Sequence, residues 1–154
     1  MTGKIDARLG KLGLKLPDAP APAANYVPYV QYGNLVFVSG QISQGPDGLI
    51  KGRLGDNMDV AAGTEAARRC GLSLLAQIRA ASGGDLDRVV RVIKLTGFVN
   101  STAEFTDQPK VINGCSDLMV EVFGDAGRHA RAAVSSPALP LGVAVEIEAI
   151  FQVE

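Results

Sequence analysis

The last segment of the chain, residues 143–153, alternates regularly between apolar and polar side chains. The odd positions are all apolar, and the even positions include Glu146, Glu148 and Gln152. A period of two is typical of a β-strand that packs one face on a core and leaves the other face polar. The sequence therefore predicts a final strand with a face that carries carboxylates.

Three other segments are expected to form strands. Residues 29–43 are rich in β-formers, most strongly at 36–39, and turn residues (GQISQGPDG) close this segment. The run VVRVIKLTGFV at 89–99 is long enough for a central strand. In the strand before the last one, Arg131, Ala133 and Ser135 share one face, opposite Ala132 and Val134.

Two helices are expected between these strands. The first spans about residues 60–82, with Asp59 as its N-cap and a Gly-Gly pair after its end. Its apolar residues form one stripe, made of Ala67, Cys70, Leu74, Ile78 and Ala81. The second helix spans about 109–123, with a proline at an early position and Gly124 near its end. A weaker helical period covers residues 2–13, and the proline-rich stretch after it predicts an extended arm along the surface.

This order of elements predicts an α+β fold, with two helices packed on one face of a mostly antiparallel or mixed sheet. We expect one domain over residues 1–154, in which residues 1–22 are an N-terminal extension and arm. The second face of the sheet is expected to hold Ala133 and Ala144 together with Glu146 and Glu148. Small apolar residues are more stable when another surface covers them, whereas carboxylates are more stable in contact with water. A subunit interface with a partly hydrated cleft meets both requirements.

Composition narrows the possible functions. The 154 residues are 47% hydrophobic and 20% charged, and their formal net charge of −1 argues against a nucleic-acid-binding protein. No apolar run is long enough for a membrane helix, and the charged first residues lack the apolar stretch of a signal peptide. A cytoplasmic location is therefore expected.

Candidates for metal or cofactor chemistry are few. Cys70 and Cys115 lie far apart in sequence and are interpreted as small buried hydrophobic residues, and His129 is the single histidine, expected in a solvated loop or at a strand edge. No phosphate-binding loop, dinucleotide motif or nucleophile elbow occurs. We therefore expect no metal and no cofactor.

Several short motifs occur in a fixed order along the chain. They are PYVQ at 28–31, LVFVSGQI at 35–42, HARAAV at 129–134, ALP at 138–140 and VEIEAI at 145–150. In this order and spacing, from about Ala23 to the C-terminus, the chain resembles the RidA/YjgF family. The resemblance implies a chorismate-mutase-like fold, a homotrimer and clefts between subunits. It also implies cofactor-free hydrolysis of 2-imino or enamine acids, such as 2-aminoacrylate, to 2-keto acids and ammonia.

The same resemblance suggests site residues. It implies that Arg131 binds the substrate carboxylate and that Glu146 lies near the attacking water, while Tyr29 and Asn113 line the cleft. The family often has a cysteine where this chain has Ala133, and the N-terminal helix and the stretch before His129 also depart from its pattern. Gly40 is expected at a bulge or a close backbone approach, with its amide or carbonyl facing the cleft.

These residue types suit the reaction. A guanidinium can hold a carboxylate through two parallel hydrogen bonds, and this fixes the imine beside an ordered water. Glu146 would then either accept a proton from the water or stabilise the iminium. Structural roles are the alternative: Arg131 in a cross-strand ion pair with Glu146 or Glu148, Tyr29 packing the arm, and Asn113 as a polar group on a helix surface.

Two other functions compete with imine hydrolysis. A trimer could bind small carboxylates as a sensor or carrier without turning them over. Ribonuclease activity is the third possibility, but the net charge of −1 and the lack of a surface combining aromatic and basic residues argue against it.

Overall fold

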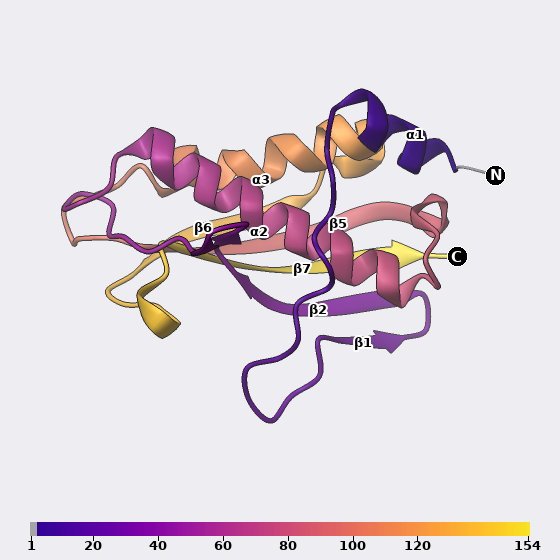
Figure 1. Cartoon of the computed structure of the whole chain (residues 1–154), viewed down its shortest axis with the longest axis horizontal. Coiled ribbons are helices and arrows are strands. Elements are labelled where there is room, and N and C mark those ends of the chain that lie inside the picture. Colours follow the sequence, from indigo (N-terminus) through magenta and orange to yellow (C-terminus); the bar gives the residue numbers. More distant parts are fainter. Residues whose placement is uncertain (1–2) are drawn as a thin grey trace.

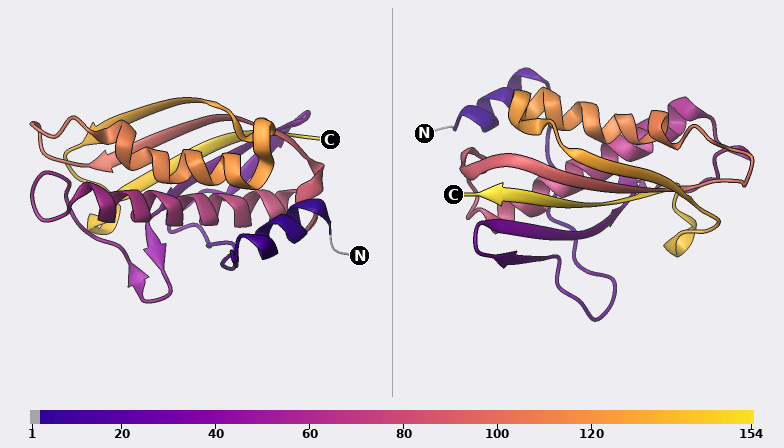
Figure 2. Two further views of the ribbon diagram at one scale, coloured as in Figure 1. Left: turned by 90° about the horizontal axis from the view of Figure 1, so that it is seen from above. Right: turned by 180° about the vertical axis from the view of Figure 1, so that it is seen from behind.

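The computed structural model describes residues 3–154 and has a mixed five-stranded sheet in the order β1-β2-β7-β5-β6. The strands are β1 (Tyr29–Tyr32), β2 (Leu35–Ile42), β5 (Val89–Asn100), β6 (Ala130–Ser136) and β7 (Val145–Val153). β5 and β6 pair in parallel, and the other three pairings are antiparallel. Helices α2 (Val60–Ala81) and α3 (Gln108–Phe123) lie side by side on one face of the sheet (Figures 1 and 2). This confirms the predicted fold class.

The two long helices begin and end close to where the sequence predicts. The Asp59 side chain accepts a hydrogen bond of 2.8 Å from the Ala62 amide, so it caps α2 as expected. Gly114 in α3 lets the two helices approach closely, because a Cβ at this position would overlap the Thr64 carbonyl oxygen of α2. Within residues 3–154, neither of these helices, nor the shorter helix α1 (Lys4–Lys11), is long and apolar enough to cross a bilayer.

The β-rich segment 29–43 is divided by a turn that the sequence did not mark clearly. Gly33 has a φ of +61° in this turn, which separates β1 from β2 and makes them a hairpin. A second hairpin follows, formed by β3 (Gln44–Gly45) and β4 (Gly48–Leu49), where turn residues were expected. Short 3-10 turns occupy Leu86–Arg88, Gly124–Gly127 and Pro140–Gly142.

The two faces of the sheet differ from the expectation in one respect. Arg131 on β6 lies beside Leu95 of β5, which is fully buried under the helices, so Arg131 and Ala133 are on the helix-covered face. Ala144 is also fully buried. The prediction that Ala133 and Ala144 lie on the uncovered face is therefore wrong. Strand alternation correctly grouped Arg131, Ala133 and Ser135, but it does not say which face the helices cover.

The uncovered face carries both carboxylates and exposed apolar side chains. Glu146 and Glu148 alternate along β7 with buried residues that face the helices. The apolar side chains exposed on this face are Val30, Tyr32, Phe37 and Val134. The uncovered face therefore combines charge with an apolar surface of several strands.

The N-terminal segment consists of α1 (Lys4–Lys11) and an irregular arm that runs to Pro28. The arm leaves α1 and descends past α2 to the edge of the sheet at β1 (Figure 1). Gln77, buried in α2, donates a hydrogen bond of 2.6 Å to the Pro20 carbonyl, and its amide nitrogen also lies 3.4 Å from Oε1 of Gln41. A buried side chain of α2 thus holds the arm against the sheet.

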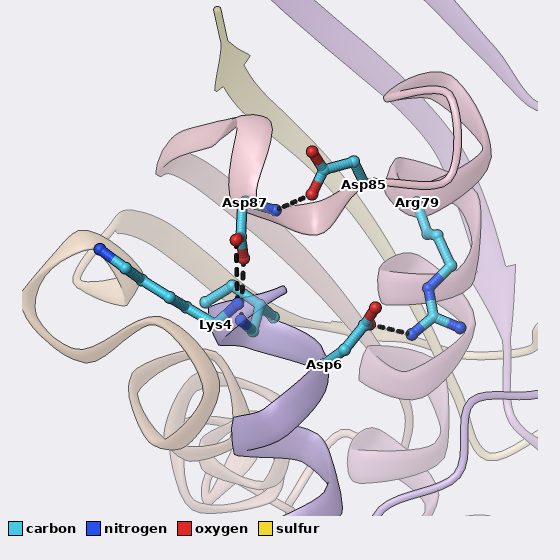
Figure 3. A network of polar contacts seen from close by, with 6 residues as sticks. Lys4, Asp6, Arg79, Asp85 and Asp87 are labelled. Carbon is cyan, nitrogen blue, oxygen red and sulfur yellow. Dashed lines mark hydrogen bonds and ion pairs between the residues drawn. The ribbon is translucent and has the colours of Figure 1, made fainter. Parts of the chain in front are cut away.

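Helix α1 buries Leu9 in the hydrophobic core, and polar contacts also hold it to the rest of the protein (Figure 3). Its N-cap, Gly3, has no side chain, and Asp87 takes over the capping role by accepting hydrogen bonds from the amides of Lys4 and Ile5 at 2.9 and 2.8 Å. Asp6 forms an ion pair of 2.8 Å with Arg79 of α2. The hydrogen bonds from the Ile5 and Lys4 amides lower the pKa of Asp87 below its ordinary value of 3.8.

We predict that replacing Asp87 with Asn loosens α1. The amide keeps one oxygen acceptor where the carboxylate has two, and it carries no charge to interact with the helix N-terminus. Hydrogen exchange of residues 4–11, measured by mass spectrometry at pH 7, should become roughly fivefold faster. The exposed Asp56, whose side chain makes no hydrogen bond within residues 3–154, offers the control Asp56→Asn.

The effect of pH gives a second test of the same contact. Because the folded pKa of Asp87 is lowered, its contribution is complete above the unfolded value and is lost as pH falls through the folded value. Wild-type α1 should therefore lose protection on acidification below about pH 4, whereas Asp87→Asn should show little of this change. Equal exchange in the wild type and the variant at pH 7 would contradict the capping role.

Candidate active site

A bulge in β2 brings Gly40 against Glu146. The pairing of β2 with β7 shifts register between Val38 and Gln41, and Gly40 lies within this irregularity. A Cβ at position 40 would lie 3.0 Å from Cδ of Glu146, so a larger residue there would push the carboxyl group slightly aside. The expected close approach at Gly40 is confirmed, and the group that approaches is the glutamate itself.

Glu146 faces a cleft of about 1000 Å³ on the uncovered face of the sheet. The lining includes Tyr26, Pro28, Gly40, Phe98, Glu146 and Glu148. The arm forms one wall of this cleft through residues 17–24, and the loop at Pro140 and Leu141 contributes to another. The N-terminal extension of the chain is therefore part of the cleft that contains the predicted catalytic glutamate.

The cleft changes the acidity of Glu146. Partial burial raises the pKa of Glu146 above its ordinary value of 4.5, and the charge of Glu148 on the same strand raises it further. A carboxyl group with a raised pKa is a stronger base when ionised, which suits proton transfer near neutral pH. Among residues 3–154, no cation lies within ion-pair distance of either glutamate.

Arg131 lies on the other face, at the edge strand β6, where α3 holds it with neutral acceptors. Its Nη1 donates to Oδ1 of Asn113 at 2.8 Å and to Oγ of Ser116 at 3.1 Å, and its Nη2 donates to the Pro109 carbonyl at 3.2 Å. Within residues 3–154, no carboxylate pairs with this guanidinium, in contrast to the alternative of a cross-strand ion pair with Glu146 or Glu148.

These bonds leave part of the guanidinium available. A guanidinium has five N–H donors, and three of those of Arg131 have partners within the described residues. The two others belong to Nε and Nη2, the pair that forms parallel hydrogen bonds with a carboxylate. Asn113 thus contacts Arg131 directly, although the sequence related the two only through the family resemblance.

Sequence reasoning missed two neighbours of Arg131. Ser116 follows Asn113 by three residues in α3, a spacing that puts both on one face of the helix and could have identified it. His129 lies in the loop directly before β6, as expected, but it is not fully solvated: its ring is half-buried, with Nε2 2.9 Å from Oγ of Ser116 and Nδ1 2.6 Å from the Gly127 carbonyl. Burial lowers the pKa of His129 below 6.5, the positive charge of Arg131 lowers it further, and the Gly127 contact opposes this.

The other predicted residues do not join these two groups within one chain. Tyr29 lies on β1, an edge strand at the opposite end of the sheet from β6, and packs against the core. Ala133 packs against the core on the face of Arg131. Because Arg131 and Glu146 lie on opposite faces, one chain contains two separate halves of the predicted site: Arg131 with Asn113, and Glu146 with Gly40.

Both cysteines lie in the hydrophobic core. Cys70 and Cys115 are free and fully buried, which confirms their interpretation as small core residues. Burial raises the pKa of Cys115 to about 12. In the part of the chain that the structure describes, no three His, Cys, Asp or Glu side chains gather as ligands for a metal ion.

The sheet, its two helices and the edge-strand arginine define a chorismate-mutase-like α+β protein. The family model described as "YjgF/chorismate_mutase-like, putative endoribonuclease" matches residues 6–151. The chain therefore belongs to the YjgF family, which includes the proteins named RidA.

Individual relatives agree with this assignment. Protein TCP17 of Trypanosoma cruzi is 50% identical over 98% of this chain and 95% of its own length. A solved structure from Shewanella oneidensis, which shares the endoribonuclease description, is 33% identical and covers 98% of this chain and 100% of its own, with a TM-score of 0.93. RidA from Psychrobacter is 29% identical and covers 88% of this chain and 94% of its own, with a TM-score of 0.60. At similar identity, the Shewanella structure covers more of this chain and has the higher TM-score.

We predict that Glu148 contributes to the acidity of Glu146 in a measurable way. In Glu148→Gln, the repulsion is removed while burial remains, so the pKa of Glu146 should fall but stay above 4.5. Carboxyl carbon chemical shifts followed by NMR from pH 3 to 9 would measure both values. The exposed Glu104 offers the control Glu104→Gln, which should leave the Glu146 titration unchanged. An unchanged midpoint in Glu148→Gln would show that burial alone sets it.

Proposed function

We propose that this protein hydrolyses small 2-imino and enamine acids, of the 2-aminoacrylate type, to 2-keto acids and ammonia in the cytoplasm, without a cofactor. The observation that carries the proposal is the guanidinium of Arg131, which is held by three hydrogen bonds to neutral groups and has no carboxylate partner within residues 3–154. Membership of the YjgF family and the name RidA of one relative support it.

Each half of the predicted site has a separate task in this reaction. Arg131 binds the carboxylate next to the imine carbon through its Nε and Nη2 donors. An enamine acid first tautomerises to the imine. Glu146 orients a water molecule and accepts its proton while the water oxygen bonds to the imine carbon, and Glu146 then returns that proton to the nitrogen. The hydroxyl proton of the resulting carbinolamine passes to the nitrogen, the carbon–nitrogen bond breaks to release ammonia, and the carbonyl of the 2-keto acid forms.

The two tasks require side chains from neighbouring copies of the chain. Arg131 and Glu146 lie on opposite faces of one sheet, so a substrate of a few atoms cannot reach both within one protomer. The uncovered face also exposes Val30, Tyr32, Phe37 and Val134, apolar side chains that gain from a cover. A homotrimer whose clefts combine Arg131 of one copy with Glu146 of the next meets both requirements.

We expect Arg131→Ala to lose most of its activity through substrate binding. 2-Aminoacrylate is generated by a pyridoxal-phosphate dehydratase, and the release of ammonia is followed with and without this protein. Loss of charge-assisted hydrogen bonds should raise KM roughly 10- to 100-fold. Glu146→Gln should instead lower kcat, since the water loses its proton acceptor while the carboxylate of the substrate is still held.

A matched control is available at Arg128, which is on the surface and pairs with Asp125 at 3.4 Å. Arg128→Ala should keep wild-type kinetics. Acceleration that persists in Arg131→Ala, or no acceleration by the wild type with several amino-acid-derived imines, would reject the proposal. Saturable binding of 2-keto acids without turnover would select a carboxylate-binding module, and RNA cleavage that survives repurification and depends on Glu146 would select a ribonuclease.

The proposed trimer has a direct test. Mass photometry or analytical ultracentrifugation should give three times the chain mass of 16.0 kDa at micromolar concentration. Phe37→Glu places a charge on the exposed apolar part of the uncovered face and should lower both the trimer fraction and the activity. The control Val90→Glu adds the same charge at another exposed apolar side chain. A fully active monomer would contradict a site shared between copies.

A further inference from the structure

Three groups form a continuous chain of hydrogen bonds that ends at Arg131. The Gly127 carbonyl lies 2.6 Å from Nδ1 of His129, and Nε2 of His129 lies 2.9 Å from Oγ of Ser116. Oγ of Ser116 in turn accepts from Nη1 of Arg131 at 3.1 Å. The chain of hydrogen bonds joins the connection before β6 to helix α3, and α3 to strand β6.

The chemistry of the groups fixes the direction of each hydrogen bond. A carbonyl oxygen only accepts, so Nδ1 of His129 carries the hydrogen that points at Gly127. In the neutral imidazole, Nε2 is then the acceptor, and the Ser116 hydroxyl donates a hydrogen bond to it. A lone pair of the Ser116 oxygen is thereby left to face the guanidinium. Every donor and acceptor in the chain has one role, and the guanidinium is the last donor.

We propose that Ser116 and His129 are positioning residues, which fix the Arg131 guanidinium so that Nε and Nη2 face the substrate carboxylate. This inference rests on the proposed function, since it concerns the same binding group. Asn113 holds one N–H of Nη1, and the Pro109 carbonyl holds one N–H of Nη2. The bond to Ser116 holds the second N–H of Nη1 and so further restricts rotation of the guanidinium, and His129 keeps the Ser116 hydroxyl turned so that its oxygen accepts.

The positioning role can be measured without any ligand. Nitrogen NMR of the arginine side chains reports rotation about the Nε–Cζ bond of Arg131. Ser116→Ala and His129→Leu should both speed up this rotation, because each removes a link of the chain. Ser116→Thr keeps the hydroxyl, and His129→Gln offers an amide oxygen where Nε2 accepts, so both should stay close to the wild type. Unchanged rotation in Ser116→Ala and His129→Leu would overturn this inference but not the proposed function.

Binding then links the positioning to the proposed function. Calorimetry with pyruvate should show about tenfold weaker binding in Ser116→Ala and His129→Leu, with Ser116→Thr and His129→Gln within about threefold of the wild type. In an Arg131→Lys background, Ser116→Ala should have little further effect, since the group it positions is gone. The control Ser136→Ala removes a hydroxyl of the same strand that bonds to the Ala138 carbonyl, and it should bind as the wild type does.

The outcomes separate the two proposals. A wild type that binds neither pyruvate nor larger 2-keto acids would overturn the proposed function, and the inference with it. If the wild type binds them and Ser116→Ala binds equally tightly, the inference is overturned and the proposed function stands. The same holds if Ser116→Ala weakens binding as much in the Arg131→Lys background as in the wild type. Thermal melting of each variant shows whether a loss of binding arises from unfolding, which the two conservative variants also control.

Discussion

The positive charge of Arg131 has no counter-charge among the described residues. The proposed binding of a substrate carboxylate depends on this. A half-buried guanidinium needs hydrogen-bond acceptors, and Asn113, Ser116 and the Pro109 carbonyl supply them without neutralising it. All three acceptors belong to α3, so the position of this helix decides where the charge points. That position depends in turn on Gly114, where the contact with α2 has no room for a side chain. Helix packing and the orientation of the Arg131 guanidinium are therefore coupled.

Glu146 presents the opposite case, a negative group in surroundings that disfavour its charge. Partial burial and the neighbouring Glu148 both raise its pKa, so the folded protein holds this carboxylate at some cost to stability when it is ionised. Such a cost is common where a residue serves a reaction rather than the fold. The two halves of the site thus carry uncompensated charges of opposite sign on opposite faces of one sheet, which a neighbouring copy would bring together in the proposed trimer.

Local patterns in the sequence predicted the elements well, because those patterns have local causes. The alternation along residues 145–153 gave β7, and Asp59 gave the start of α2 through a contact three residues away. The face on which Arg131 lies could not be predicted, because it depends on which side of the sheet the helices cover. The contact of His129 with Ser116 crosses from a loop to a helix, and no spacing in the sequence indicates it. Asn113 was found only by resemblance to a family, although its spacing from Ser116 is a local signal.

The contact between Gly40 and Glu146 has a consequence for how these two positions can change. A side chain larger than hydrogen at position 40 displaces the carboxyl group, and a shorter residue at position 146 removes the reason for the glycine. A substitution at one position therefore changes what the other accommodates, although one belongs to the first half of the sequence and the other lies close to its end. In related chains, we expect substitutions at positions 40 and 146 to occur together.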